Sequence, residues 1–312
     1  MDIIGLIQAA RVEVFGEHGK KLFGTTIFGE DHRPAAIWLN AGSTVIGQRH
    51  TAAHEWGHYI LGHTATCEIT IGAPDPATID GGTTADRDAM AARTLPETTA
   101  EAFAAWLLMP RAALAATLRA LRVTGTPSPR QCYVLSLVLG TSYRGTARQL
   151  RTARLIDQTA SDFLMRIAPG RIKRALDCSG VPVPDPRANI WRLSDFGGCT
   201  DLVLAHGDRV IADQAELDIA DALLENGLAE TIAESSMTRV LSATAPSHHN
   251  RSRSTLRIPR PVGDLTVRVD QVIRGVADPS AVLDVSTMTE DEIDEHFRLQ
   301  EQLFRASRGH LT

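Results

Sequence analysis

The sequence predicts an α+β protein with a small N-terminal sheet among helices, a short helical segment, and a mixed, β-rich C-terminal part. Stretches rich in β-branched and aromatic residues occur before residue 41 and again beyond residue 186. Between residues 97 and 156, apolar residues recur instead at spacings of three and four. The hydrophobic content of 43% is high enough to bury a core, which argues against a disordered chain. The length of 312 residues predicts about two domains.

Charge and cysteine content narrow the class of protein further. The chain has 32 Lys and Arg against 37 Asp and Glu, a net charge of −5 that does not indicate a polyanion-binding protein as a whole. Its four cysteines form no C-x-x-C pair, which argues against a disulfide framework and a four-thiolate zinc site. The N-terminus lacks the pattern of a secretion signal, and no apolar run reaches the roughly 18 residues of a membrane span. We therefore expect a soluble, cytoplasmic protein without a membrane partner.

The elements of the first half follow from local patterns. Ile3, Ile4, Ile7, Ala10 and Val14 predict an amphipathic helix over 2–15. Two strands are predicted at 22–28 and 35–40 around a hairpin connection, and a helix at 51–61 that Gly62 ends. Residues 72–96 contain Pro and Gly and predict a surface loop before a second helix at 97–110.

The second half changes character beyond a linker at 182–186. Before it, leucine spacing continues over 111–121, and two short helices joined at Gly140, with Thr141 or Ser142 as a cap, give a helix-turn-helix pattern. After it, strands are predicted within 189–193, 200–205, 208–212, 255–261 and 264–273, around a helix at 215–234. A capping box at Thr289 and Glu292 predicts a final amphipathic helix.

The residues that indicate chemistry are His54, Glu55 and His58, which form an H-E-x-x-H motif on the predicted helix 51–61. Four residues make about 400° of helical turn, so both imidazoles project from one side and can hold one metal ion. Glu55 lies about 100° away, where its carboxylate can serve as a general base towards a water molecule at the metal.

A catalytic zinc needs a third protein ligand. His63 is near in sequence but falls on the far face if the helix continues, and the histidine of the metzincin spacing would have to be at position 64, which is Thr. Glu97 and Glu101 lie one turn apart on one face of the next predicted helix. The residues alone leave open which of these two carboxylates completes the site.

Two segments together resemble a known family. HTAAHEWGHYILGH followed by ETTAEAFAAWLLMP resembles the ImmA/IrrE metallopeptidases, over about residues 20–155. In their E-x-x-A-N-x-F-A-x-x-L-L-M-P pattern the leading Glu is the metal ligand, and this position is Glu97. Glu101 replaces the usual Asn, and the 38 residues between His58 and Glu97 are a long gap for the family.

The resemblance implies a zincin-like metallopeptidase domain over 1–123, followed by a helical, helix-turn-helix-like segment over 124–165. A C-terminal domain of unknown role at 166–285 and an amphipathic helix at 286–312 complete the expected organisation. The family implies Zn²⁺ held by His54, His58 and Glu97, with Glu55 as general base. It further implies a protein substrate, such as a helix-turn-helix repressor, and the strand 35–40 is a candidate sheet edge for its extended segment.

A second hypothesis is a regulatory or DNA-binding protein whose zinc site is structural or sensory. Residues 111–156 contain eight arginines and no acidic residue, in a chain that is acidic overall. The segment has no base-reading signature, so nucleic acid is the less favoured partner. The sequence does not indicate an oligomeric state.

Overall fold

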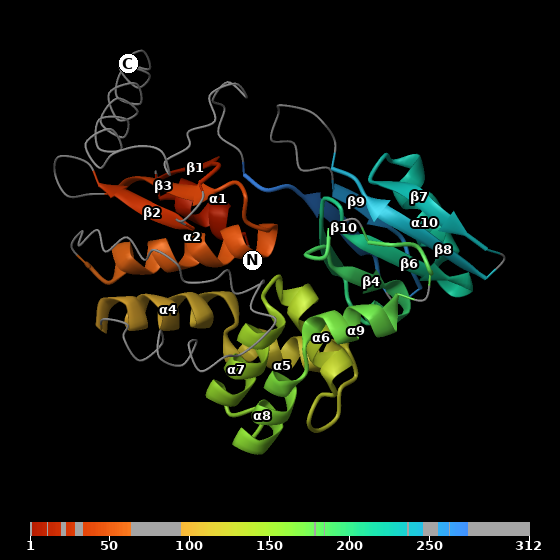
Figure 1. Cartoon of the computed structure of the whole chain (residues 1–312), viewed down its shortest axis with the longest axis horizontal. Helices are drawn as coiled ribbons and strands as arrows, with labels where there is room; N and C mark the ends of the chain where they lie inside the picture. The colour runs from red at the N-terminus through yellow and green to blue at the C-terminus, as the bar shows by residue number, and fades with distance from the viewer. Residues whose placement is uncertain are drawn as a thin grey trace, which may run out of the picture.

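The structure is a computed structural model, which describes residues 2–10, 12–19, 23–28, 34–63, 95–177, 179–183, 185–235, 237–245, 255–261 and 263–273. Helices and strands both contribute substantially, so the predicted α+β class is confirmed. Figure 1 shows three groups of elements: a small sheet with helices, a group of helices, and a β-rich part. The predicted loop at 72–96 lies largely outside the described residues, and the C-terminal helix lies wholly outside them.

The N-terminal sheet has three strands in the order β1-β3-β2. Helix α1 (Ile3–Ala9) precedes β1 (Glu13–Glu17), which pairs in parallel with β3 (Pro34–Asn40), and β2 (Gly24–Phe28) pairs antiparallel with β3. The predicted helix over 2–15 was therefore wrong beyond Ala9, because Val12 and Val14 bury their side chains with the two-residue period of a strand. The prediction that 35–40 forms a sheet edge was also wrong, since β3 is central and β2 is an edge strand.

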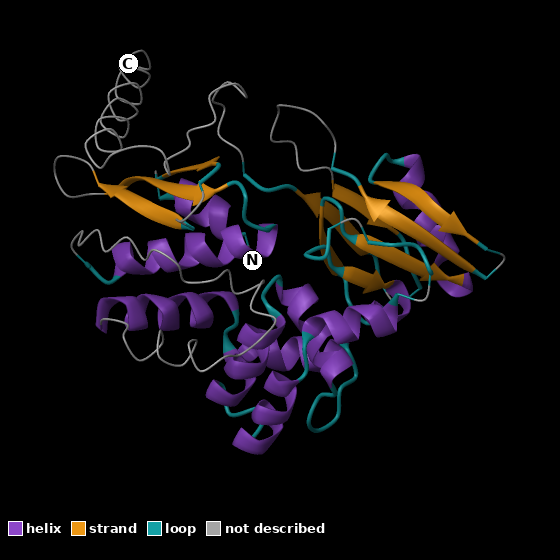
Figure 2. Cartoon of the chain, viewed as in Figure 1, coloured by secondary structure: helices purple, strands orange, loops and turns teal. Residues whose placement is uncertain are grey.

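Two helices pack together beneath this sheet. Helix α2 (Val45–Ile60) lies between the sheet and α4 (Leu95–Leu108), as Figures 1 and 2 show. The Thr44 hydroxyl caps α2 by accepting a hydrogen bond from the Gly47 N–H, so the helix begins earlier than predicted. The two helices approach closely where Gly57 faces Ala100 and Phe103, and a β-carbon at Gly57 would lie 3.2 Å from the Ala100 carbonyl oxygen.

Five helices lie between α4 and the first C-terminal strand: α5 (Arg111–Ala120), α6 (Pro129–Leu139), α7 (Tyr143–Thr152), α8 (Gln158–Arg166) and α9 (Pro169–Leu176). A capping box between Ser128 and Gln131 starts α6, and Gly140 ends it in the left-handed region with φ of +62°. Of the two predicted caps, Ser142 is the residue that starts α7. The two short helices joined at Gly140 are thus present as the sequence indicated.

The C-terminal part contains β4 (Ile190–Arg192), β5 (Asp201–Ala205), β6 (Arg209–Asp213), α10 (Leu217–Glu225), β7 (Ala229–Glu234), β8 (Thr238–Ala243), β9 (Thr255–Ile258) and β10 (Leu265–Asp270). Short 3-10 helices, η1 and η2, lie at Leu193–Phe196 and Gln214–Glu216. The strands form a sheet of order β4-β6-β8-β7 and one of order β5-β10-β9. The predicted helix at 215–234 was too long, because Gly227 at φ of +66° ends the helical segment and β7 follows.

Specific hydrogen bonds join the three groups of elements. The buried Gln48 side chain of α2 donates to the Ile273 carbonyl at 3.0 Å and accepts from the Ile273 N–H at 2.6 Å, beyond the end of β10. The Tyr133 hydroxyl of α6 accepts from the Ile190 N–H of β4 at 3.0 Å. Within the described ranges, no helix is both long and apolar enough to cross a bilayer.

Candidate metal centre

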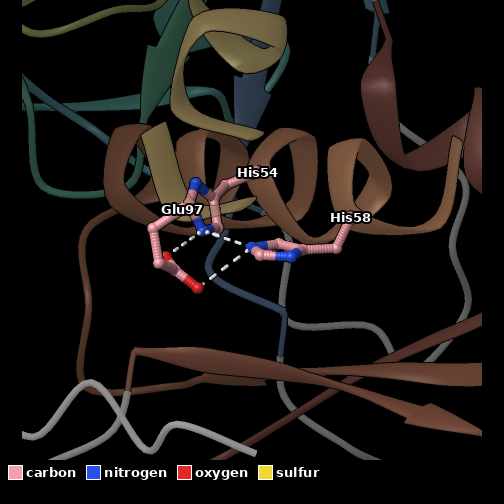
Figure 3. A group of neighbouring side chains, drawn as sticks. All are labelled: His54, His58 and Glu97. Carbon is pink, nitrogen blue, oxygen red and sulfur yellow. Dashed lines mark hydrogen bonds and ion pairs between the residues drawn. The ribbon is translucent and has the colours of Figure 1, made fainter. Parts of the chain in front are cut away.

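Three side chains from two helices converge at one point (Figure 3). His54 and His58 lie one turn apart on α2, and Glu97 lies in the first turn of α4. The two histidine Nε2 atoms are 3.0 Å apart, and the Glu97 carboxylate lies 3.2 Å from Nε2 of His54 and 3.3 Å from Nε2 of His58. One ligand atom from each residue lies within 4.8 Å of the other two, which is a separation that one cation can bridge.

The donor set fits a divalent transition metal. Two imidazole nitrogens and one carboxylate oxygen are the ligands of many three-residue zinc sites that leave a fourth position open. Hydrogen bonds from His54 and His58 hold the pKa of Glu97 well below its usual range, so its carboxylate is ionised. For His54, burial alone would lower the pKa, but Glu101, Glu97 and Glu55 outweigh it and raise the value to about 9. The surroundings of the His54 imidazole therefore favour its positively charged form.

The second acid, Glu101, lies beside the three converging residues rather than among them. Its Oε2 is 3.6 Å from Nδ1 of His54, the nitrogen opposite the one that faces Glu97. The same oxygen is 3.1 Å from Nε2 of His50. Burial would raise the pKa of Glu101, yet its contacts with His50 and His54 lower it strongly. The structure thus places Glu97 at the converging point and Glu101 behind His54.

The contact between His50 and Glu101 was not predicted from the sequence. A signal was present, because His50, His54 and His58 recur every four residues and share one face of α2. Glu97 and Glu101 show the same spacing on α4. The histidine row and the glutamate row run in opposite directions. Glu97 contacts His58 and His54, and Glu101 contacts His54 and His50.

The Glu55 carboxylate contacts strand β2 of the sheet and is not one of the three converging groups. The Thr26 hydroxyl of β2 donates a hydrogen bond to Oε2 of Glu55 at 2.9 Å. Thr26 is itself buried, so this bond fixes the Glu55 carboxylate from the side of an edge strand. Thr26 was not among the residues that the sequence singled out, because the contact joins residues 29 positions apart.

The far-face position of His63 applied only to a continuing helix, and α2 does not continue to His63. Helix α2 ends at Ile60, and the chain reverses at Gly62, where φ is +67°. His63 returns towards α2, and its Nδ1 lies 3.1 Å from Nδ1 of His58. Burial and the charge of His58 lower the pKa of His63, which favours its neutral form. His63 therefore contacts a member of the triplet without joining it.

Comparison with known proteins agrees with this arrangement. Residues 17–130 match the family model of the IrrE N-terminal-like domain, peptidase family M78. This stretch of the chain is therefore similar to an IrrE N-terminal-like domain. The resemblance inferred from the two sequence motifs is thereby confirmed, because both motifs lie inside the matched range. Neither a search of curated proteins nor one of solved structures found a significant match.

The IrrE N-terminal-like domain begins within β1 and includes the sheet strands β2 and β3, helices α2, α4 and α5, and the first residues of α6. The match supports a metallopeptidase of the IrrE kind. The match ends at residue 130, so the helices beyond the start of α6 and the C-terminal sheets lie outside it.

Proposed function

We propose that the protein is a zinc-dependent endopeptidase of the ImmA/IrrE type with a zincin-like catalytic domain. The observation that carries this proposal is the convergence of His54, His58 and Glu97 beside Glu55. Two nitrogens and one ionised carboxylate match the ligands of a catalytic zinc. When bound there, zinc would supply Lewis acidity, polarising a peptide carbonyl and acidifying a water molecule.

Glu55 supplies the proton transfers in this proposal. Its position next to His54 in α2 places a carboxylate close to the converging ligands without making it one of them. The carboxylate takes a proton from the attacking water and returns it to the leaving amine, as a general base and then a general acid. The Thr26 hydroxyl holds one oxygen of Glu55, which leaves the other oxygen to receive the proton.

The neighbouring strand indicates how a polypeptide could lie in the site. Strand β2 is an edge of its sheet, and Thr26 on this strand contacts Glu55 directly. An extended segment that adds to this edge would bring its backbone past Glu55 and the converging ligands. The substrate in this proposal is a protein partner with an extended segment, and a helix-turn-helix repressor is the partner that the family resemblance favours.

Glu55→Gln tests the catalytic role. The variant keeps the ligand set and the size of the side chain but cannot accept a proton, so it should bind zinc normally and lose at least about 100-fold in cleavage rate. Purified products of the neighbouring genes serve as candidate substrates. Mass spectrometry then identifies the fragments that cleavage releases. Full biological activity of Glu55→Gln would reject the peptidase in favour of a regulatory protein with a structural or sensory zinc site.

A second candidate function, DNA binding, is favoured by one specific observation. Arg144, Arg148 and Arg151 lie along one side of α7, and the last two are well exposed. Helix α7 follows α6 across a short turn at Gly140, as the second helix of a helix-turn-helix does. Arginines on the outward side of such a helix could contact phosphates of duplex DNA.

Salt-dependent binding to a random-sequence duplex tests this second function. Replacing the three arginines of α7 by Ala should weaken binding and reduce the salt slope by about 3, because each phosphate contact contributes about 0.9. The matched control replaces Arg119 on α5 and Arg171 and Arg174 on α9, which are exposed on other helices and remove the same charge. Equal losses in both triple variants would reduce the effect to net charge and remove α7 as a DNA-binding helix.

A further inference from the structure

The end of α2 has the hydrogen bonds of a Schellman motif. The Gly62 N–H donates to the Tyr59 carbonyl at 3.0 Å, and the His63 N–H donates to the His58 carbonyl at 3.0 Å. Gly62 has φ of +67°, a conformation that other L-residues rarely adopt. In this motif, the residue after the glycine folds back onto the helix residue five positions earlier. That geometry brings the His63 side chain to His58.

The two imidazoles meet through their Nδ1 atoms, 3.1 Å apart, with their ring centroids 5.0 Å apart. The other nitrogen of His63, Nε2, lies 3.2 Å from the Thr99 hydroxyl oxygen. Thr99 belongs to the second turn of α4, two residues after Glu97. His63 therefore bridges the end of α2, which carries His58, and the start of α4, which carries Glu97.

When the Nε2 lone pair of His58 faces a metal ion, the hydrogen bonds of this bridge can run in only one direction from donor to acceptor. The proton of His58 is then on Nδ1 and donates to Nδ1 of His63, so the proton of His63 is on Nε2 and donates to Thr99. The Thr99 hydroxyl in turn donates to the carbonyl of Leu95 at 3.0 Å or of Pro96 at 2.9 Å. Every donor in the chain has an acceptor.

We propose that His63 is a positioning residue that fixes the tautomer and orientation of His58 and links the two ligand-bearing helices through Thr99. This inference rests on the metal site of the proposed function, but it concerns a residue outside the ligand set. Outer partners of metal-bound histidines typically change metal affinity by about 10- to 100-fold when they are removed. Because His63 contacts both ligand-bearing helices, we expect it to act within this range.

Zinc affinity of the full-length protein, measured by competition with a chromophoric chelator, tests the proposal. His63→Ala and His63→Leu should each weaken binding by about 10-fold or more. His63→Asn should recover most of the affinity, because the Asn oxygen can accept from Nδ1 of His58. Thr99→Val should weaken binding by a smaller factor and Thr99→Ser should restore it. The Co²⁺-loaded variants give an independent readout, since altered ligand orientation changes the visible absorption bands.

Two glycines provide a matched pair of backbone variants. Gly62→Ala strains the turn that returns His63 to His58, whereas Gly62→Asn tolerates positive φ and should keep the affinity near wild type. Gly125 also has positive φ, +77°, and an added β-carbon would meet nothing at either site. Gly125→Ala should therefore lower the melting temperature about as much as Gly62→Ala does. Unlike Gly62→Ala, it should leave zinc affinity unchanged.

The outcomes separate this inference from the proposed function. If the wild-type protein binds no zinc, or His58→Ala binds as tightly as wild type, the metal site itself is rejected. If the wild type binds zinc but His63→Leu matches it, the positioning role alone is rejected. Equal weakening by His63→Leu and His63→Asn would also reject it, because a general packing effect does not depend on a hydrogen-bond acceptor.

Discussion

At the scale of single residues, the site consists of two complementary rows of side chains. His50, His54 and His58 on α2 meet Glu97 and Glu101 on α4 in opposite directions. A four-residue shift between the helices would exchange the roles of the two acids, which is why the sequence alone left both open. The ring nitrogen that each acid contacts decides between the two acids. Nε2 of His54 and Nε2 of His58 both face Glu97, whereas Glu101 contacts Nδ1 of His54.

This geometry predicts different consequences for the two acids. Glu97→Gln removes a charged ligand and should abolish stoichiometric zinc binding at micromolar concentrations. Glu101→Gln leaves the ligands in place and weakens only the orientation of His54, so affinity should fall by about 10-fold. Metal content after dialysis and chelator competition distinguish the two. The reverse order of effects would make Glu101 the ligand.

The raised pKa of His54 predicts how zinc binding varies with pH. With a value of about 9, His54 in the metal-free protein keeps a proton well above the ordinary histidine pKa of 6.5. Zinc must displace this proton, so affinity should increase about tenfold per pH unit from pH 7 to pH 8.5 and level off above 9. Chelator competition over this range checks the slope, and an affinity that is constant above pH 7 would contradict it.

At the scale of elements, the same kind of error occurred twice. The predicted helices at 2–15 and 215–234 each proved to be a shorter helix followed by a strand, β1 and β7. In the first, Val14 fits both a helical stripe with Ile7 and the two-residue alternation of a strand. Pairing with β3, a contact distant in sequence, decides in favour of the strand. Helices are present at the predicted segments 51–61 and 97–110, where periodicity and C-terminal signals agree, but α2 begins earlier, at Val45.

The close packing of α2 against α4 gives a prediction at this scale. Gly57 lies between His54 and His58, and a β-carbon there would lie 3.0 Å from the Phe103 ring and 3.3 Å from the Ala100 Cα. Gly57→Val should push the helices apart, cost about 1–3 kcal/mol of unfolding free energy and weaken zinc binding. Urea unfolding and chelator competition measure the two effects. Ala102→Val, on the exposed side of α4, should change both only slightly, and comparable losses in this control would contradict the argument.

At the scale of the whole molecule, three consecutive residues of α2 contact three different parts of the chain. Gln48 binds Ile273 after the last described strand, and Arg49 donates to the carbonyls of Leu139 and Gly140 at the end of α6. His50 reaches Glu101 on α4. Sequence reasoning could not find these links, because each joins residues more than 50 positions apart and no local pattern encodes them. Helix α2, which carries two residues of the candidate metal centre, therefore also contacts each of the described parts of the molecule.

The Gln48 contact predicts how strongly the C-terminal part is coupled to this helix. Gln48→Leu removes the partners of the Ile273 N–H and carbonyl. It also removes the donor at 3.1 Å from the Asn40 carbonyl, which keeps the hydrogen bond from the Ser43 N–H. Because buried polar groups without partners cost about 1–3 kcal/mol each, and the segment at Ile273 can partly regain water, the unfolding free energy should fall by about 2–4 kcal/mol.

Urea unfolding followed by both circular dichroism and tryptophan fluorescence measures this loss. Trp38, Trp56 and Trp106 belong to the N-terminal part and Trp191 to the C-terminal part. Loss of the link should therefore also separate the unfolding transition seen by circular dichroism from the one seen by fluorescence. Gln214→Leu, at an exposed position, serves as the control, and a Gln48→Leu variant as stable as this control would show that the parts are held by their apolar contacts alone.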